Sequence, residues 1–89
     1  MTMTLNGLAK LSEELGELQQ IVGKMMAYGK GPHPDGTLNL HDRFEEEAGD
    51  VIASILFVNY THNLNLDSIK TRSIKKLKKF FEWHFDENA

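Results

Sequence analysis

The chain has 89 residues, which suits one small domain spanning residues 1–89. A lone chain of this size buries only about 60% of its unfolded surface, so its core needs further support. The absence of cysteine excludes disulfides and leaves a metal ion, further copies of the chain, or both.

The net charge of −3 is unevenly distributed along the chain. Residues 1–66 hold nine acids and four Lys/Arg, a balance of −5, whereas residues 67–89 hold six Lys/Arg and four acids, a balance of +2. All six of these bases fall between Lys70 and Lys79. One part of the chain could therefore hold cations, and another could meet anions.

The location of the protein is inferred by elimination. Residues 1–11 lack a basic start followed by an apolar run, so no signal peptide is expected. The longest apolar run, Val51 to Val58, is far shorter than the roughly 20 residues that span a bilayer. The sequence therefore predicts a cytoplasmic protein with no membrane segment.

Apolar residues at spacings of three and four predict an amphipathic first helix. It should start near Thr4 or Asn6, either of which could cap it, and end by Tyr28. Its apolar stripe consists of Leu8, Leu11, Leu15, Leu18, Val22 and Met25. The glycines and prolines of "YGKGPHPDG" then predict a loop up to about Asn39.

Two further helices follow the loop. The second should run from Leu40 or Asp42 to Tyr60 or Asn63, with Asp42 as its N-cap. Its main stripe is Phe44, Ala48, Val51, Ile55 and Val58. The third should begin at Asp67 or Ser68 and reach about Phe85, with an apolar side formed by Ile69, Ser73, Leu77, Phe80, Phe81 and His84. The predicted class is all-α, a small antiparallel bundle of three main helices.

Two pairs of acids lie beside apolar positions of the first two helices. Glu14 and Glu17 are i,i+3 neighbours, as are Glu47 and Asp50, so each pair can reach one object. A carboxylate next to a core is costly unless a proton, a base or a metal neutralises it. Only three bases, Lys10, Lys24 and Arg43, share the two helices with seven acids: Glu13, Glu14, Glu17, Glu45, Glu46, Glu47 and Asp50. A divalent metal that prefers oxygen ligands is therefore the natural counter-charge.

These acids also carry a family resemblance. "KLSEELGEL" (residues 10–18) and "EEEAGDVIASIL" (residues 45–56) resemble the paired E-E-x-x-E and E-x-x-D signatures of the all-α nucleoside triphosphate pyrophosphohydrolases. This is the MazG-like group, which includes dimeric dUTPases and phosphoribosyl-ATP pyrophosphatases. The resemblance covers roughly residues 5–60 and implies hydrolysis of a (d)NTP between the α and β phosphates, giving a monophosphate and pyrophosphate.

The resemblance assigns roles to individual residues. It implies Mg²⁺, with Mn²⁺ as a substitute, held by Glu14, Glu17, Glu47 and Asp50, with Glu13 and Glu46 as flanking catalytic groups. It also implies phosphate contacts from the last helix. "KKLKKFFEWHF" (residues 75–85) is similar to the K-F-x-R-R-F ending of MazG domains, and the candidates are Lys79, Lys76 and Arg72. Glu82, Trp83 and His84 stand where arginines would be expected.

Partners follow from the same features. The chain has almost no room for the helix that family modules often carry before the E-E-x-x-E helix, which favours completion of the bundle as a homodimer or homotetramer. No DNA-binding motif accompanies the basic stretch, so nucleic acid is not expected as a partner. The alternative function is a non-catalytic helical module that binds a nucleotide or another protein.

Overall fold

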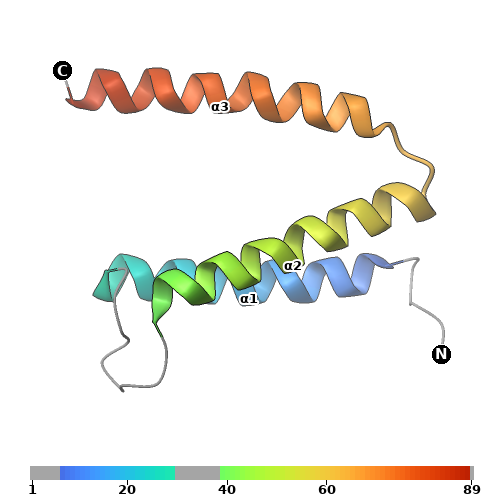
Figure 1. Ribbon diagram of the computed structural model, residues 1–89, viewed down its shortest axis with the longest axis horizontal. Coiled ribbons are helices and arrows are strands. Elements are labelled where there is room, and N and C mark those ends of the chain that lie inside the picture. The colour runs from blue at the N-terminus through green and yellow to red at the C-terminus, as the bar shows by residue number, and fades with distance from the viewer. Residues whose placement is uncertain (1–6, 30–38, 89) are drawn as a thin grey trace.

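The computed structural model describes residues 7–29 and 39–88, which form three helices and no strand within those ranges. Helix α1 spans Leu8–Tyr28, α2 spans Leu40–Thr61 and α3 spans Leu66–Asn88. The predicted all-α class and the three main helices are confirmed (Figure 1). Within the described ranges, no helix is long and apolar enough to cross a membrane.

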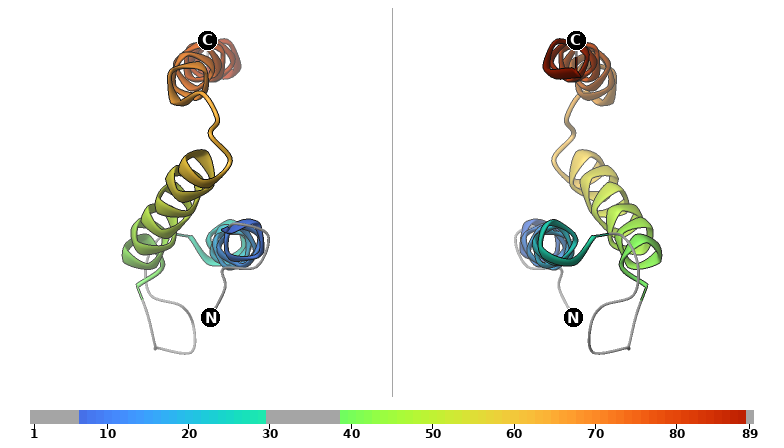
Figure 2. Two further views of the ribbon diagram at one scale, coloured as in Figure 1. Left: turned by 90° about the vertical axis from the view of Figure 1, so that its right-hand side faces the viewer. Right: turned by 90° about the vertical axis from the view of Figure 1, so that its left-hand side faces the viewer.

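Helices α1 and α2 pack against each other as an antiparallel hairpin (Figures 1 and 2). The small core of the hairpin consists of Ile21, Leu40, Val51 and Val58, and it also encloses two acids, Glu14 and Glu47. The predicted stripe of α2 is therefore buried at Val51 and Val58 and half-buried at Phe44, Ala48 and Ile55.

The leucine stripe of α1 does not form the hairpin core as a whole. Leu11, Leu18 and Met25 are half-buried, whereas Leu8, Leu15 and Val22 are exposed. The side of α1 that meets α2 is rotated toward Glu14 and Ile21. The structure thus places an acid where the sequence pattern favours a leucine.

Each predicted N-cap differs from the observed one by a few residues. Thr4 and Asn6 lie outside the described residues, and α1 begins after Gly7, whose φ of 92° is left-handed. Asn39, not Asp42, caps α2, because its side chain accepts a hydrogen bond from the Asp42 N–H. The shift at α2 arises because the amide side chain of asparagine can cap a helix as well as aspartate can.

A turn of defined geometry joins α2 to α3. Asn63 adopts a left-handed φ of 53°, its N–H donates to the Tyr60 carbonyl, and the Leu64 N–H donates to the Asn59 carbonyl. This pair of hydrogen bonds is a Schellman motif with asparagine in the usual glycine position. Asn65 then caps α3, since its side chain accepts from the Ser68 N–H at 3.1 Å. The predicted caps Asp67 and Ser68 are therefore wrong, because Asn65 precedes both.

Helix α3 leaves this turn and diverges from the hairpin (Figure 1). It packs along neither α1 nor α2, and its predicted apolar side is exposed throughout. The predicted bundle of three main helices therefore consists, within one chain, of the α1–α2 hairpin and a third helix that projects from it.

The start of α1 provides a test of this fold. A Cβ on Gly7 would lie 2.6 Å from the Phe57 ring, and the left-handed backbone disfavours any side chain. Gly7→Ala should lower the free energy of unfolding by at least about 1–2 kcal/mol. Gly16→Ala is the matched control, because its Cβ meets open space within α1 and should raise stability by up to about 1 kcal/mol. Urea unfolding at one fixed chain concentration measures both. If Gly7→Ala were as stable as the wild type, the left-handed backbone and the close approach to Phe57 described at Gly7 would be wrong.

Candidate metal centre

Three carboxylates from the two hairpin helices meet at one point. Glu14 of α1 and Glu47 and Asp50 of α2 each offer an oxygen, and these oxygens all lie within 4.8 Å of one another. Glu14 is 7% exposed and Glu47 only 1%, whereas Asp50 is exposed. The cluster therefore consists of two buried carboxylates and one carboxylate that is open to solvent.

The two buried acids keep one unsatisfied oxygen each. Oε2 of Glu14 and Oε2 of Glu47 are both buried without a hydrogen-bond partner. A buried acceptor of this kind costs about 1–3 kcal/mol, and more when it is charged. Because both residues belong to the same cluster, one bound cation could neutralise both carboxylates.

Lys10 supplies part of the balancing charge on the α1 side. Its Nζ lies 3.3 Å from Oε1 of Glu14 and 3.4 Å from Oε2 of Glu13. A hydrogen bond to Glu14, followed by the charge of Glu13, raises the pKa of Lys10 above its ordinary value. The resulting stabilisation is fully present at neutral pH and is lost only as the pH rises through that raised pKa.

Arg43 supplies balancing charge on the α2 side. Its guanidinium lies 2.6 Å from Oε1 of Glu47 and 3.2 Å from Oε2 of Glu46, while about a third of its side chain remains exposed. The hydrogen bond with Glu46 is the largest cause that raises the pKa of Arg43, partial desolvation opposes it, and the charges of Glu47 and Glu17 add to the rise. Arg43 therefore pairs with two carboxylates of its own helix, one of them the buried Glu47.

The remaining sequence-predicted residues occupy different positions. Glu17 is half-buried and is close enough to act electrostatically on Arg43, but it does not belong to the group of three oxygens. Glu13 and Glu46 are exposed and held in ion pairs with Lys10 and Arg43. The structure thus brings together Glu14, Glu47 and Asp50 and leaves Glu17 beside them.

The three basic candidates for phosphate contact are all on α3, which does not pack against the hairpin. The ammonium of Lys76 stands 5.8 Å from the centre of the Phe80 ring and 5.5 Å from that of Trp83, a cation–π arrangement. Arg72 and Lys79 are exposed. Within one chain, none of the three is placed beside the carboxylates.

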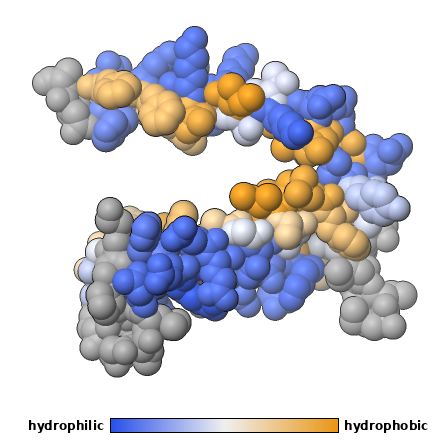
Figure 3. Space-filling model, viewed as in Figure 1, coloured by the Kyte–Doolittle hydropathy of each residue, from blue (hydrophilic) through white to orange (hydrophobic). Residues whose placement is uncertain are grey.

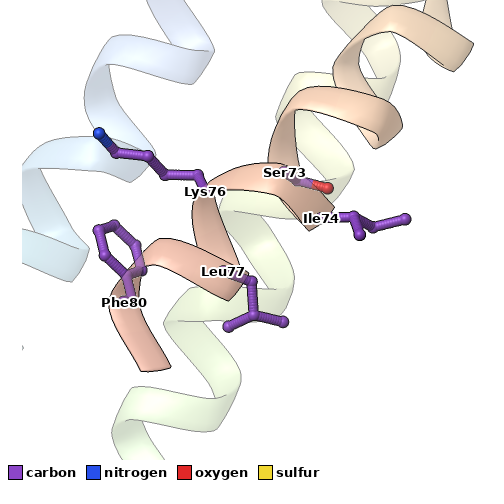
Figure 4. Close-up of a pocket in the computed structure, with 5 residues that line it drawn as sticks. All are labelled: Ser73, Ile74, Lys76, Leu77 and Phe80. Atoms are coloured by element: carbon purple, nitrogen blue, oxygen red, sulfur yellow. The ribbon is translucent and has the colours of Figure 1, made fainter. Parts of the chain in front are cut away.

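One hollow of the structure, of about 460 Å³, lies on α3 and is lined by Ser73, Ile74, Lys76, Leu77 and Phe80 (Figure 4). Because all five lining residues come from one helix, it is an open surface groove rather than a substrate pocket.

Sequence reasoning assigned no role to Lys10 or Arg43, although both carried a signal. Lys10–Glu14 and Arg43–Glu47 are i,i+4 pairs of opposite charge, which are neighbours on a helix. That spacing predicts the two ion pairs that hold the buried carboxylates.

The cluster fits a divalent oxygen-binding ion. Mg²⁺ binds oxygens at about 2.0–2.1 Å, so opposite ligands lie about 4 Å apart, a separation compatible with oxygens that all lie within 4.8 Å of one another. Asp50, the exposed member, can adjust its position by side-chain rotation. A second group, His41, Asp42 and Glu45, also lies within 4.8 Å, but all three are exposed and carry no orphaned atom.

Comparisons of the chain with family models, curated proteins and solved structures return no match. The family resemblance therefore rests on the motif residues alone.

Metal binding can be tested without any substrate. Mg²⁺ or Mn²⁺ should raise the thermal unfolding midpoint, because an ion that binds only the folded chain adds about 2.7 kcal/mol at 100 times its Kd. Asp50→Asn should weaken this response, and its exposure means that the fold should survive the change. Asp67→Asn on α3 is the control and should respond as the wild type does. Equal midpoint shifts in all three proteins, or none in the wild type, would contradict a metal centre at Asp50.

Proposed function

We propose that this protein is a Mg²⁺-dependent nucleotide pyrophosphohydrolase of the MazG-like type. It would cleave a (d)NTP between the α and β phosphates and release a (d)NMP and pyrophosphate in the cytoplasm. The observation that carries the proposal is the convergence of Glu14, Glu47 and Asp50, two of them buried with an unsatisfied oxygen. The type of reaction is inferred from the motif resemblance.

The residues divide into holding and proton-accepting roles. Glu14, Glu47 and Asp50 would hold the metal, with Glu17 close by to complete the set. When bound, Mg²⁺ offsets negative charge on the phosphates and makes a water easier to deprotonate. Glu13 and Glu46 are exposed carboxylates beside the cluster, each oriented by an ion pair, and either can accept a proton from an attacking water.

Phosphate contacts require a further element. Lys79, Lys76 and Arg72 can reach a substrate at the cluster only if α3 is brought to a hairpin, because α3 does not pack against its own. The proposed homodimer or homotetramer provides that opportunity. Within this set, Arg72 and Lys79 are the stronger candidates, since Lys76 is already engaged with two aromatic rings.

Pyrophosphate release from a panel of ribo- and deoxyribonucleoside triphosphates with Mg²⁺ tests the activity. Glu47→Gln should abolish release from the best substrate, because the amide removes a charged ligand while keeping the size of the side chain. Glu45→Gln, an exposed acid on the same helix, is the matched control and should retain activity.

Circular dichroism shows whether Glu47→Gln keeps its helices, which is needed to interpret its activity. If Glu47→Gln is helical and fully active, the proposed centre is wrong. If no nucleotide in the panel is turned over by the wild type, the catalytic proposal fails as a whole.

A specific observation favours the second candidate, a non-catalytic module that binds a nucleotide or a protein. Lys10 and Arg43 already pair with Glu14 and Glu47, as in a structural ion-pair network. Titration with Mg²⁺ and a nonhydrolysable nucleotide separates the two, since a binder saturates without turnover of any triphosphate.

A further inference from the structure

The hairpin carries the same short pattern of charges twice. Residues 10–17 read KLSEELGE and residues 43–50 read RFEEEAGD, so a base, two adjacent acids, a glycine and a further acid recur at the same spacing. We call these segments the two half-sites; the first lies on α1 and the second on α2. Lys10 and Arg43 occupy the same place in the two half-sites, as Glu14 and Glu47 do. The base is therefore as regular a part of each half-site as the acids are.

Both bases lie on the side of their helix that carries the acids. Around the axis of α1, Lys10 falls within the arc of about 60° between Glu14 and Glu17, and Arg43 has the same placement in its own half-site. Each base also lies one turn before the buried acid of its half-site. Helices α1 and α2 are antiparallel (Figure 1), so the two bases approach the cluster from opposite ends. A ligand held at the cluster would thus have one base on each side.

Each base holds its buried acid through one oxygen. Nζ of Lys10 lies 3.3 Å from Oε1 of Glu14, and the guanidinium of Arg43 lies 2.6 Å from Oε1 of Glu47. Oε2 of each of these acids is buried without a hydrogen-bond partner among the described residues. The two carboxylates that would hold a cation are thus the ones that hold Lys10 and Arg43.

Both bases can leave these contacts. The side chain of Lys10 is 48% exposed and that of Arg43 is 33% exposed. Their second partners, Glu13 and Glu46, are 55% and 66% exposed. Exposed ion pairs contribute little to stability, because water and salt screen them. The contacts with Glu13 and Glu46 are therefore too weak to hold the two bases once a cation neutralises the buried acids.

A polyphosphate needs positive charge at this site. The two half-sites hold seven acids and two bases, a balance of −5, so one divalent cation leaves them negative and repulsive to an anion. Lys10 and Arg43 are those two bases. Glu17 of α1 acts electrostatically on Arg43 of α2, so this base lies within reach of acids from both helices. Phosphate oxygens near the cluster would therefore be attracted by these two side chains.

The surface of the hairpin is open to such an anion. In Figure 3, hydrophilic side chains cover the hairpin around the N-terminal half of α2, whereas apolar ones cover the C-terminal half of that helix. The half-site at residues 43–50 belongs to the N-terminal half, and its Asp50 is exposed. A charged ligand can therefore approach the cluster over a hydrophilic surface.

We propose that Lys10 and Arg43 exchange partners when the site is loaded: they leave the buried acids, which take a divalent cation, and bind phosphate oxygens of the nucleotide from its two sides. Each base is thus first a counter-ion that the cation replaces and then a ligand of the substrate. Arg43 has the planar fork that binds two phosphate oxygens at once, whereas Lys10 supplies a point charge. The choice of a polyphosphate rests on the proposed function. The hairpin then makes phosphate contacts of its own, besides any that α3 adds.

Isothermal titration calorimetry of Lys10→Met and Arg43→Met tests the exchange without turnover. Each variant should bind Mg²⁺ at least about threefold more tightly than the wild type, because a competing positive charge is gone. At saturating Mg²⁺, each should bind inorganic pyrophosphate about 10- to 100-fold more weakly, because a charge-assisted hydrogen bond is lost. Lys24→Met is the control, since it removes the same charge about 15 Å along α1 from Glu14 and should bind both ligands as the wild type does.

The opposite signs of the two changes separate the exchange from a structural role. A base that only stabilises the hairpin would lower the affinities for Mg²⁺ and for pyrophosphate together, and that result would overturn the proposal. Unchanged pyrophosphate affinity in either variant, or a wild type that binds no Mg²⁺, would overturn it as well. Lys10→Arg should bind pyrophosphate at least as tightly as the wild type, because it keeps the charge and adds the planar fork.

Arginine side-chain NMR follows the exchange in the wild type and so does not depend on the folding of any variant that lacks a base. The chain has two arginines, Arg43 and Arg72, and Arg72→Lys assigns their signals. The guanidinium signals of Arg43 should shift on addition of Mg²⁺ and shift again on addition of pyrophosphate. Signals of Arg43 that respond to neither ligand, or a response to pyrophosphate at Arg72 alone, would contradict the exchange.

These measurements distinguish the exchange from the proposed reaction. If no nucleoside triphosphate is hydrolysed but the exchange is observed with Mg²⁺ and pyrophosphate, the catalytic proposal fails and the exchange stands. If triphosphates are hydrolysed while Lys10→Met and Arg43→Met keep the wild-type KM and pyrophosphate affinity, the exchange fails and the proposed function stands.

Discussion

The burial of two carboxylates between α1 and α2 is the constraint on which the rest of this structure depends. Glu14 and Glu47 are buried in the same small core as Ile21, Leu40, Val51 and Val58, at positions where further apolar residues would be expected. Charged groups in such a place require neutralising partners at short range. Lys10 and Arg43, each four residues from its acid, meet part of that requirement, and a cation held by the cluster would meet the rest.

The same constraint explains why the apolar surface of the hairpin is left unused. With acids in the α1–α2 contact, the side of α1 that bears Leu8, Leu15 and Val22 is turned away from α2. Apolar side chains therefore remain exposed on the outside of the hairpin. The buried acids between α1 and α2 and the exposed apolar side of α1 thus have the same cause.

The sequence was sufficient for the helices and for the acid pair on each of the first two, because both depend on local periodicity. The ends Tyr28 and Leu40 and the i,i+3 acid pairs are properties of single helices. The position of α3 could not be predicted, since its periodicity shows which side is apolar but not what that side meets. The caps were missed because Asn39 and Asn65 compete with nearby aspartate and serine for the same backbone N–H groups. Nor could the pattern show that Glu14, rather than Leu15, lies against α2.

The turn at Asn63 has a consequence for the direction of α3. Its hydrogen bonds and the left-handed backbone of Asn63 orient a helix that packs along neither α1 nor α2. The orientation of the last quarter of the molecule is thus set by a few residues of backbone rather than by a packed interface. A substitution in this turn would therefore redirect the whole of α3 without altering the contact between α1 and α2.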